Sequence, residues 1–188
     1  MRLRPVSGRA RSLSAAGIVA LLVIAVTGGP VSAKTALHAC RVLTPAEARY
    51  LQPGVWPQGQ ETTNALGSLC TYQSGATSSA VIVASLQILP AKEVHNLGPL
   101  LAEMQEWVKD PSLAGDKSFR LRRVSGIGGG AILTTGQTQA GGTDTGLFWA
   151  HGPNAFSLTS RDVGAGAPWI ARTSEVLAIG KQIDAKLP

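Results

Sequence analysis

The two cysteines of this chain restrict its fold more than any other feature of the sequence. Cys40 and Cys70 are the only cysteines among 188 residues. In a protein of an oxidising compartment an even number of cysteines indicates a disulfide. Closing a loop of this length stabilises a fold by about 3–4 kcal/mol through chain entropy. We therefore expect a Cys40–Cys70 disulfide, which leaves no free thiolate for a catalytic cysteine.

The N-terminal segment indicates export. Residues 1–11 carry four arginines and no acidic residue, and an apolar run follows over residues 15–26. A membrane-spanning helix needs about 20 apolar residues, so this shorter run is typical of a signal peptide. Small residues predict cleavage after Ala33. We expect residues 1–33 to be a signal peptide and residues 34–188 to form one domain in the periplasm, cell envelope or extracellular space.

The net charge does not indicate a polyanionic partner once this segment is set aside. The whole chain is formally +6, but four of its 17 basic residues lie in residues 1–11. Residues 34–188 therefore hold 13 basic and 11 acidic residues. A local cluster of cations in residues 117–123 is interpreted as a solvated strand or loop. We expect no nucleic-acid partner.

Three helices are expected. Thr44, Pro45 and Glu47 form the pattern of a capping box with proline at the first helical position. Apolar residues at three- and four-residue steps predict a second helix from Pro90 to residue 108 and a third over residues 167–187. The expected buried stripe of the third helix consists of Ile170, Thr173, Leu177, Gly180, Ile183 and Leu187.

Strands are expected between these helices. Alternating or β-branched runs predict strands over residues 69–73, 79–89, 131–135, 145–151 and 155–161. Residues 55–67 are expected to form a polar loop, and residues 112–123 are polar and expected to be partly loop. Each half of the chain then ends in strands followed by an amphipathic helix. This order predicts an α+β fold, a mainly antiparallel sheet with amphipathic helices packed on one face.

Two short motifs resemble a known family. Residues 40–48, C-R-V-L-T-P-A-E-A, and residues 69–72, L-C-T-Y, resemble an actinobacterial family of exported envelope proteins, often lipoproteins, whose domain has no assigned function. The family also shares a Gly-Ile-Gly turn, similar to residues 126–128, and a C-terminal helix. Gly129 departs from it, since an acidic residue is more typical there. The resemblance implies the fold and the disulfide, and no catalytic residue.

Lipidation is the alternative fate of Cys40. Residues 37–40, L-H-A-C, loosely resemble a lipidation box. However, residues 27–39 separate Cys40 from the apolar run, and His38 stands where a small residue is usual. We expect membrane attachment only if Cys40 is lipidated.

The glycine-rich segment Gly126 to Gly130 is a weak candidate for cofactor binding. Together with Ala131 it satisfies the G-x-G-x-x-A dinucleotide pattern. That pattern needs a following helix whose N-terminus holds the pyrophosphate, whereas a strand is expected here. We interpret the segment as a turn that permits close backbone packing, and we expect no cofactor.

Catalytic and metal-binding patterns are weak. His38, His95 and His151 lack a second ligand at metal spacing, and no G-x-S-x-G elbow occurs. Asp144 and His151 could share one end of the sheet with Ser157 or Ser160 nearby. This grouping supports the alternative hypothesis of a small exported hydrolase whose residues come from several strands.

Trp56 is the candidate contact for a ligand or partner. It lies in a polar loop between Val55 and Pro57, and exposed aromatic side chains often anchor partners. A lid over the core is the other interpretation. Our preferred hypothesis is a non-enzymatic binding module for an unknown protein, lipid or cell-wall ligand.

Overall fold

The computed structural model describes residues 37–65, 67–74, 80–90, 106, 109–110, 119–137, 142–164 and 172–188. These residues contain seven strands and three helices. The strands are β1 (Gln60–Asn64), β2 (Gly67–Gln73), β3 (Ala80–Pro90), β4 (Arg120–Val124), β5 (Ala131–Gln137), β6 (Thr143–His151) and β7 (Asn154–Gly164). The helices are α1 (Ala39–Val42), α2 (Pro45–Leu51) and α5 (Thr173–Lys186).

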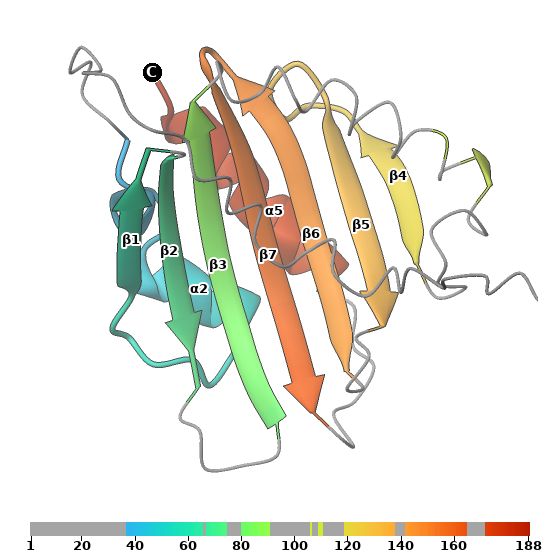
Figure 1. Cartoon of the computed structure of the whole chain (residues 1–188). Coiled ribbons are helices and arrows are strands. Elements are labelled where there is room, and N and C mark those ends of the chain that lie inside the picture. The colour runs from blue at the N-terminus through green and yellow to red at the C-terminus, as the bar shows by residue number, and fades with distance from the viewer. Residues whose placement is uncertain are drawn as a thin grey trace, which may run out of the picture.

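All seven strands form one antiparallel sheet in the order β1-β2-β3-β7-β6-β5-β4 (Figure 1). The series β1 to β3 and the series β4 to β7 each follow the chain, and they join where β3 pairs with β7. The β6–β7 connection is a tight hairpin. His151 pairs with Asn154, which leaves Gly152 and Pro153 as the turn.

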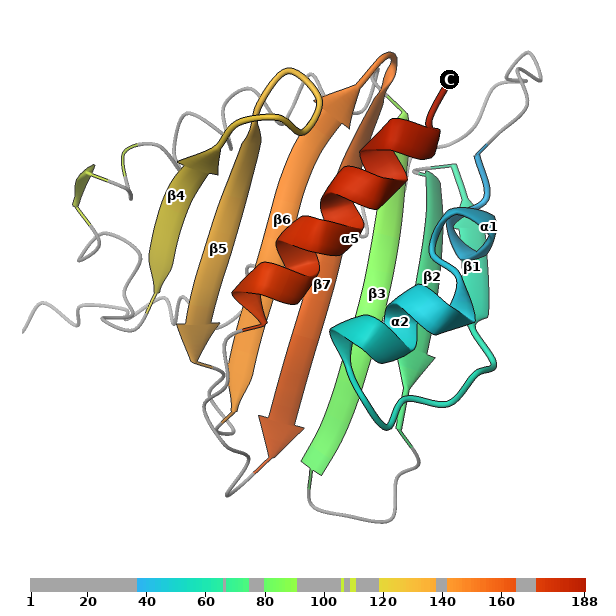
Figure 2. The same ribbon diagram turned by 180° about the vertical axis from the view of Figure 1, so that it is seen from behind.

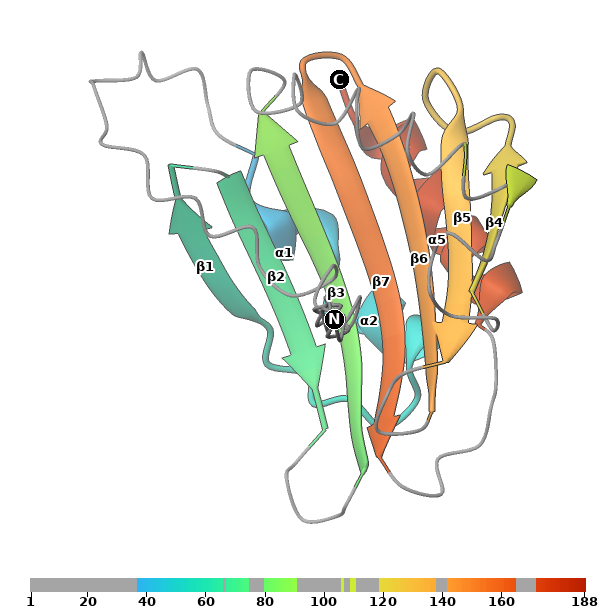
Figure 3. The same cartoon turned by 45° about the vertical axis from the view of Figure 1, so that its right-hand side comes forward.

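The helices α1, α2 and α5 lie on the same face of this sheet, as Figures 2 and 3 show. The capping box of α2 is confirmed, because the Thr44 side chain accepts from the Glu47 backbone N–H and the Glu47 carboxylate accepts from the Thr44 backbone. An ion pair between Glu47 and Lys186 connects α2 to α5. None of the helices in the described part of the chain has the length and hydrophobicity that a bilayer span requires.

The α+β class predicted from the sequence is wrong. Within the described ranges the structure is mostly a seven-stranded antiparallel sheet with a short helix at each end, and 49% of these residues are in strands and 25% in helices. Strand β1 lies where a loop was expected, and β4 lies in the segment that was interpreted as a solvated strand or loop. All five side chains of β1 are exposed, and β4 exposes three arginines, so neither shows the alternation that predicts a strand. Both are edge strands, and pairing with a single neighbour determines their conformation.

The predicted helices differ from the structure in two places. Pro90 ends β3 rather than opening a helix, and the rest of that expected helix lies outside the described residues, apart from Glu106. Helix α5 begins at Thr173, and residues 167–171 are not described. Its buried face is made of Val176, Ile179, Gly180 and Ile183. The expected stripe is confirmed at Gly180 and Ile183, whereas Thr173 and Leu177 are only partly buried beside this face.

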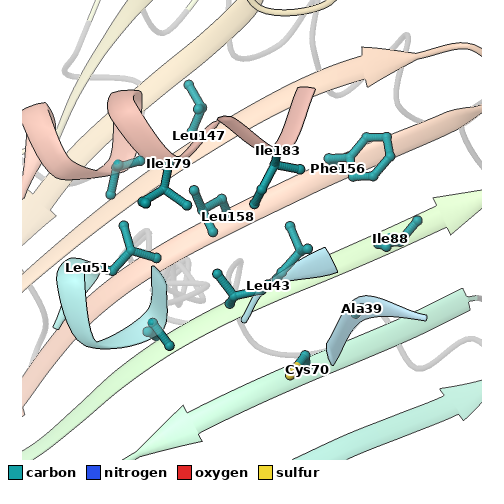
Figure 4. Close-up of a cluster of buried hydrophobic side chains, with 14 of the residues drawn as sticks. Ala39, Leu43, Leu51, Cys70, Ile88, Leu147, Phe156, Leu158, Ile179 and Ile183 are labelled. Atoms are coloured by element: carbon teal, nitrogen blue, oxygen red, sulfur yellow. The ribbon is translucent and has the colours of Figure 1, made fainter. Parts of the chain in front are cut away.

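The core lies between the helices and the sheet (Figure 4). Leu43 and Leu51 from the N-terminal segment pack with strand residues such as Leu147 and Leu158, and Ile183 contributes from α5. All five side chains are fully buried. In β3 the even-numbered residues Ala84, Leu86 and Ile88 face this core.

Candidate functional site

The predicted disulfide between Cys40 of α1 and Cys70 of β2 is present, with the two Cα atoms 4.9 Å apart. Cys70 is fully buried, so the bond connects α1 to the interior of the sheet. A disulfide indicates an oxidising, non-cytoplasmic location. A sulfur bonded in this way cannot also carry a lipid thioether, so the disulfide-bonded form excludes lipidation of Cys40.

Polar contacts support this connection. The backbone N–H of Ala39 donates to Ser68 Oγ at 2.9 Å, and Ser68 Oγ donates to Glu61 Oε1 at 2.7 Å. The bond from Ser68 lowers the pKa of Glu61, with the nearby His38 adding to the effect. His38 lies 3.3 Å from the same carboxylate. The first histidine of the sequence is therefore the partner of an acidic side chain on β1.

Trp56 lies in the segment between α2 and β1, and its side chain is 56% exposed. Its backbone is nevertheless fixed, because its N–H donates to the Gln73 carbonyl at 3.0 Å and the preceding Val55 is buried in the core. Tyr50, on the last turn of α2, is 55% exposed. These are the two large exposed hydrophobic side chains of the described residues. We call Tyr50 and Trp56 the aromatic pair.

The grouping of Asp144 and His151 with a serine is not formed. Asp144 and His151 stand at opposite ends of β6, about 23 Å apart along the strand at about 3.3 Å per residue. Asp144 accepts from Arg161 Nε at 3.0 Å. Burial raises the pKa of Asp144, and Arg161 opposes this effect. This carboxylate therefore serves a local ion pair on β6 and β7 rather than a histidine.

The serines are also separated from His151. Ser157 pairs in register with Phe148, so it faces away from the side of the sheet that carries Trp149 and His151. Ser160 is on the helix side, but it is buried and donates to the Leu51 carbonyl at 3.3 Å. Neither hydroxyl can be activated by His151.

His151 instead pairs with Asp184 of α5, a contact that the sequence did not indicate. His151 Nδ1 lies 2.7 Å from Asp184 Oδ1, and the Gly128 backbone N–H donates to Asp184 Oδ2 at 2.7 Å. The other ring nitrogen of His151 lies 3.3 Å from the backbone oxygen of Pro188. Asp184 therefore joins α5 to the end of β6 and to the β4–β5 turn.

The charge of Asp184 is stabilised in this position. Burial opposes ionisation, but the bonds from Gly128 and His151 outweigh it and lower the pKa of Asp184 below its ordinary value of 3.8. The buried indole N–H of Trp149 contributes as well, although its geometry is too poor for a full hydrogen bond. Because the folded-state pKa is lowered, this stabilisation is present above pH 3.8 and is lost as the pH falls through the lower folded-state value.

Replacement of Asp184 by asparagine should therefore destabilise the protein in a pH-dependent manner. We expect Asp184→Asn to lower the free energy of unfolding by about 1–2 kcal/mol at neutral pH, and the difference from wild type to shrink as the pH falls below about 4. Urea unfolding of the variant and the wild type at pH values between about 3 and 7 measures this difference in the free energy of unfolding. Glu106→Gln is the control, because Glu106 is an exposed carboxylate paired with Lys109 and should change stability little at any pH. A pH-independent loss in Asp184→Asn would contradict the assignment.

The glycine-rich segment connects two strands, β4 and β5, and so lacks the helix that a dinucleotide site needs. Ile127 at its centre is fully buried, and Gly128 has φ +50° with the Ala150 carbonyl directly beside it. A Cβ at position 128 would lie 2.2 Å from that oxygen. The turn thus permits close backbone packing, and it also supplies the N–H that Asp184 accepts.

No three His, Cys, Asp or Glu side chains within the described ranges come together as a candidate metal site. His95, Trp107 and Trp169 lie outside those ranges. Comparison of the chain with protein-family models, curated proteins and solved structures finds no match. The candidate contact residues are therefore chosen from their exposure in the structure, and they are the aromatic pair.

Proposed function

We propose that this protein is an exported, non-enzymatic binding module that attaches to a cell-envelope partner through Tyr50 and Trp56. The observation that carries the proposal is the exposure of Trp56 on a fixed backbone. Trp56 is 56% exposed, so a partner that covered it would remove apolar surface from water, which is favourable. Aromatic side chains with a polar tip are the residues that most often anchor interfaces.

The scaffold suits this role. The Cys40–Cys70 disulfide, the capping box of α2 and the hydrogen bond from Trp56 to Gln73 all restrain the segment that carries the aromatic pair. A restrained contact surface loses less conformational entropy on binding than a mobile loop does. The proposal includes cleavage after Ala33, and its partner is a protein, a lipid or a cell-wall component.

The alternative of a small exported hydrolase has no observation in its favour. In the described part of the chain, His151 contacts the carboxylate of Asp184 and the Pro188 oxygen. Acyl transfer through a serine needs a hydroxyl within hydrogen-bond distance of the base. Ser157 and Ser160 do not meet this condition.

Replacement of Trp56 should abolish partner binding while the fold remains intact. The protein, expressed from the full sequence, is incubated with isolated membrane and cell-wall fractions, cross-linked and quantified. We expect Trp56→Ala to reduce retention by at least about tenfold, as for an interface hot spot, and Trp56→Phe to retain most of it. The change in stability should remain within about 1 kcal/mol because the side chain is largely exposed.

Gln58→Ala is the matched control, since Gln58 is an exposed polar residue of the same segment. It should bind as wild type does. Equal retention of wild type and Trp56→Ala in every fraction would overturn the proposal. The fraction that retains the wild type identifies the partner as a membrane or a wall component.

A further inference from the structure

The two edges of the sheet differ in how they are protected from pairing with other chains. Strands β1 and β4 are the edge strands. An edge strand presents a row of backbone N–H and C=O groups, and proteins commonly protect such a row with charged side chains, proline, bulges or a covering element. Strand β4 carries the adjacent arginines Arg122 and Arg123, which are both exposed. A second copy paired antiparallel about the centre of β4 would place Arg122 opposite its own equivalent, and like charges in that position repel.

Strand β1 lacks this protection. Its sequence Q-E-T-T-N contains no proline and no basic residue, and all five side chains are exposed. No helix or strand of the described residues lies beyond its outer edge (Figures 1 and 3). Helix α1 packs over β1, β2 and β3 from one face of the sheet, so it does not cover this edge.

The one charged side chain of β1 is held within its own subunit. Glu61 pairs in register with the buried Cys70, so it lies on the helix side of the sheet. Its carboxylate accepts from Ser68 Oγ at 2.7 Å and lies 3.3 Å from His38 Nδ1. These contacts direct the carboxylate toward the start of α1. The charge of Glu61 therefore protects the edge less than a free charge would.

The sequence of β1 is complementary to itself in one antiparallel register. When a two-fold axis passes at Thr62, this residue lies opposite Thr62 of the second copy, and Glu61 lies opposite Thr63 of the second copy. This register pairs the whole length of β1, and opposed threonines are a favourable cross-strand contact. An axis at Glu61 would instead place the two carboxylates opposite each other, which is unfavourable.

We infer that β1 pairs in this register with β1 of a second copy of the chain, so that one sheet extends across both subunits. Alternate residues of the two strands exchange backbone hydrogen bonds, and strand addition of this kind derives its affinity from main-chain contacts. Five paired residues form a small interface, so we expect a reversible dimer with a dissociation constant on the order of 10–100 μM. The alternative, that a short polar edge strand remains in water, predicts a monomer at every concentration.

This pairing goes beyond the proposed binding module and does not depend on the aromatic pair. A dimer presents two aromatic pairs, and two linked contacts hold a repeating surface more tightly than one contact does. Trp56→Ala should lose retention by envelope fractions but form the dimer as wild type does. Failure of either proposal therefore leaves the other intact.

Opposite charges at Thr62 test the register directly, because this residue faces its own equivalent. Sedimentation velocity of the protein, expressed from the full sequence and recovered after export, should show a dimer that grows with concentration between about 1 and 500 μM. Thr62→Lys and Thr62→Glu should each weaken dimerisation by at least about tenfold, because like charges then lie opposite each other. An equimolar mixture of the two variants should form a dimer at least as readily as wild type does, because opposite charges then meet.

Gln58→Lys is the matched control, since Gln58 is exposed, lies outside β1 and receives the same charge. It should change the dissociation constant by less than about twofold. Circular dichroism of each variant checks that the fold is retained, as expected for substitutions of exposed residues. A monomer at every concentration, equal weakening in Thr62→Lys and Gln58→Lys, or no recovery in the mixture would overturn the inference.

Discussion

Replacing Cys40 and Cys70 together with alanine should lower the free energy of unfolding by about 3–4 kcal/mol. The bond links positions 30 residues apart, and its loss releases the entropy of the unfolded chain that the closed loop had restricted. Typical domains have a total stability of about 5–15 kcal/mol, so a large share would be lost. Urea unfolding of the variant and the wild type measures the difference. Alanine avoids burying a hydroxyl at position 70, which is fully buried.

Wild-type protein in the presence of reductant is the control for this experiment, because its two side chains are otherwise unchanged. It should unfold at a urea concentration close to that of the double variant. Identical unfolding of the oxidised and the reduced wild type would mean that the disulfide does not stabilise the fold.

Substitution of Gly128 by alanine should destabilise the protein by about 2–4 kcal/mol. The residue has φ +50°, and the added Cβ would lie 2.2 Å from the Ala150 carbonyl oxygen. A shift of the turn to relieve this contact would also withdraw the N–H that Asp184 accepts. Backbone strain costs about 1–3 kcal/mol, and the lost hydrogen bond adds about 1 kcal/mol.

Gly129→Ala is the matched control on the neighbouring residue. No atom lies within 4 Å of the position that its Cβ would occupy, and its φ is not in the left-handed region. We expect Gly129→Ala to be neutral or to stabilise by up to about 1 kcal/mol. If thermal or urea unfolding gave equal losses for both variants, the close packing at Gly128 would be contradicted.

Local signals in the sequence predicted local structure well. The Thr44–Glu47 pattern predicted the start of α2, and the alternation over residues 79–89 predicted strand β3. The two cysteines predicted the disulfide. Each of these features depends on residues that are near in sequence or on a single pair, so composition and spacing were sufficient.

Pairing between distant residues could not be predicted in the same way. The polar sequence Q-E-T-T-N of β1 forms a strand because it pairs with β2. Strand β1 was missed for this reason, since it lies at an edge of the sheet and pairs with β2 alone. The stripe expected for α5 included Gly180 and Ile183 but omitted Val176 and Ile179, which are buried by packing that the helical spacing alone does not determine.

The candidate sites show the same difference between local signals and contacts of distant residues. Trp56 was identified from the sequence because a tryptophan between Val55 and Pro57 in a polar segment is unusual. The contact of Asp184 with Gly128 spans 56 residues, and no pattern in the sequence connects them.

Export as a disulfide-closed domain is the condition on which the binding proposal rests, and intact mass spectrometry of the exported protein tests it most directly. The protein is recovered from envelope and medium without reductant, and its mass is measured before and after reduction. We predict a chain that begins at Lys34 and gains the mass of two hydrogen atoms on reduction. A lipid adduct on a chain beginning at Cys40, with Cys70 unpaired, would contradict both the disulfide and the proposed mode of binding.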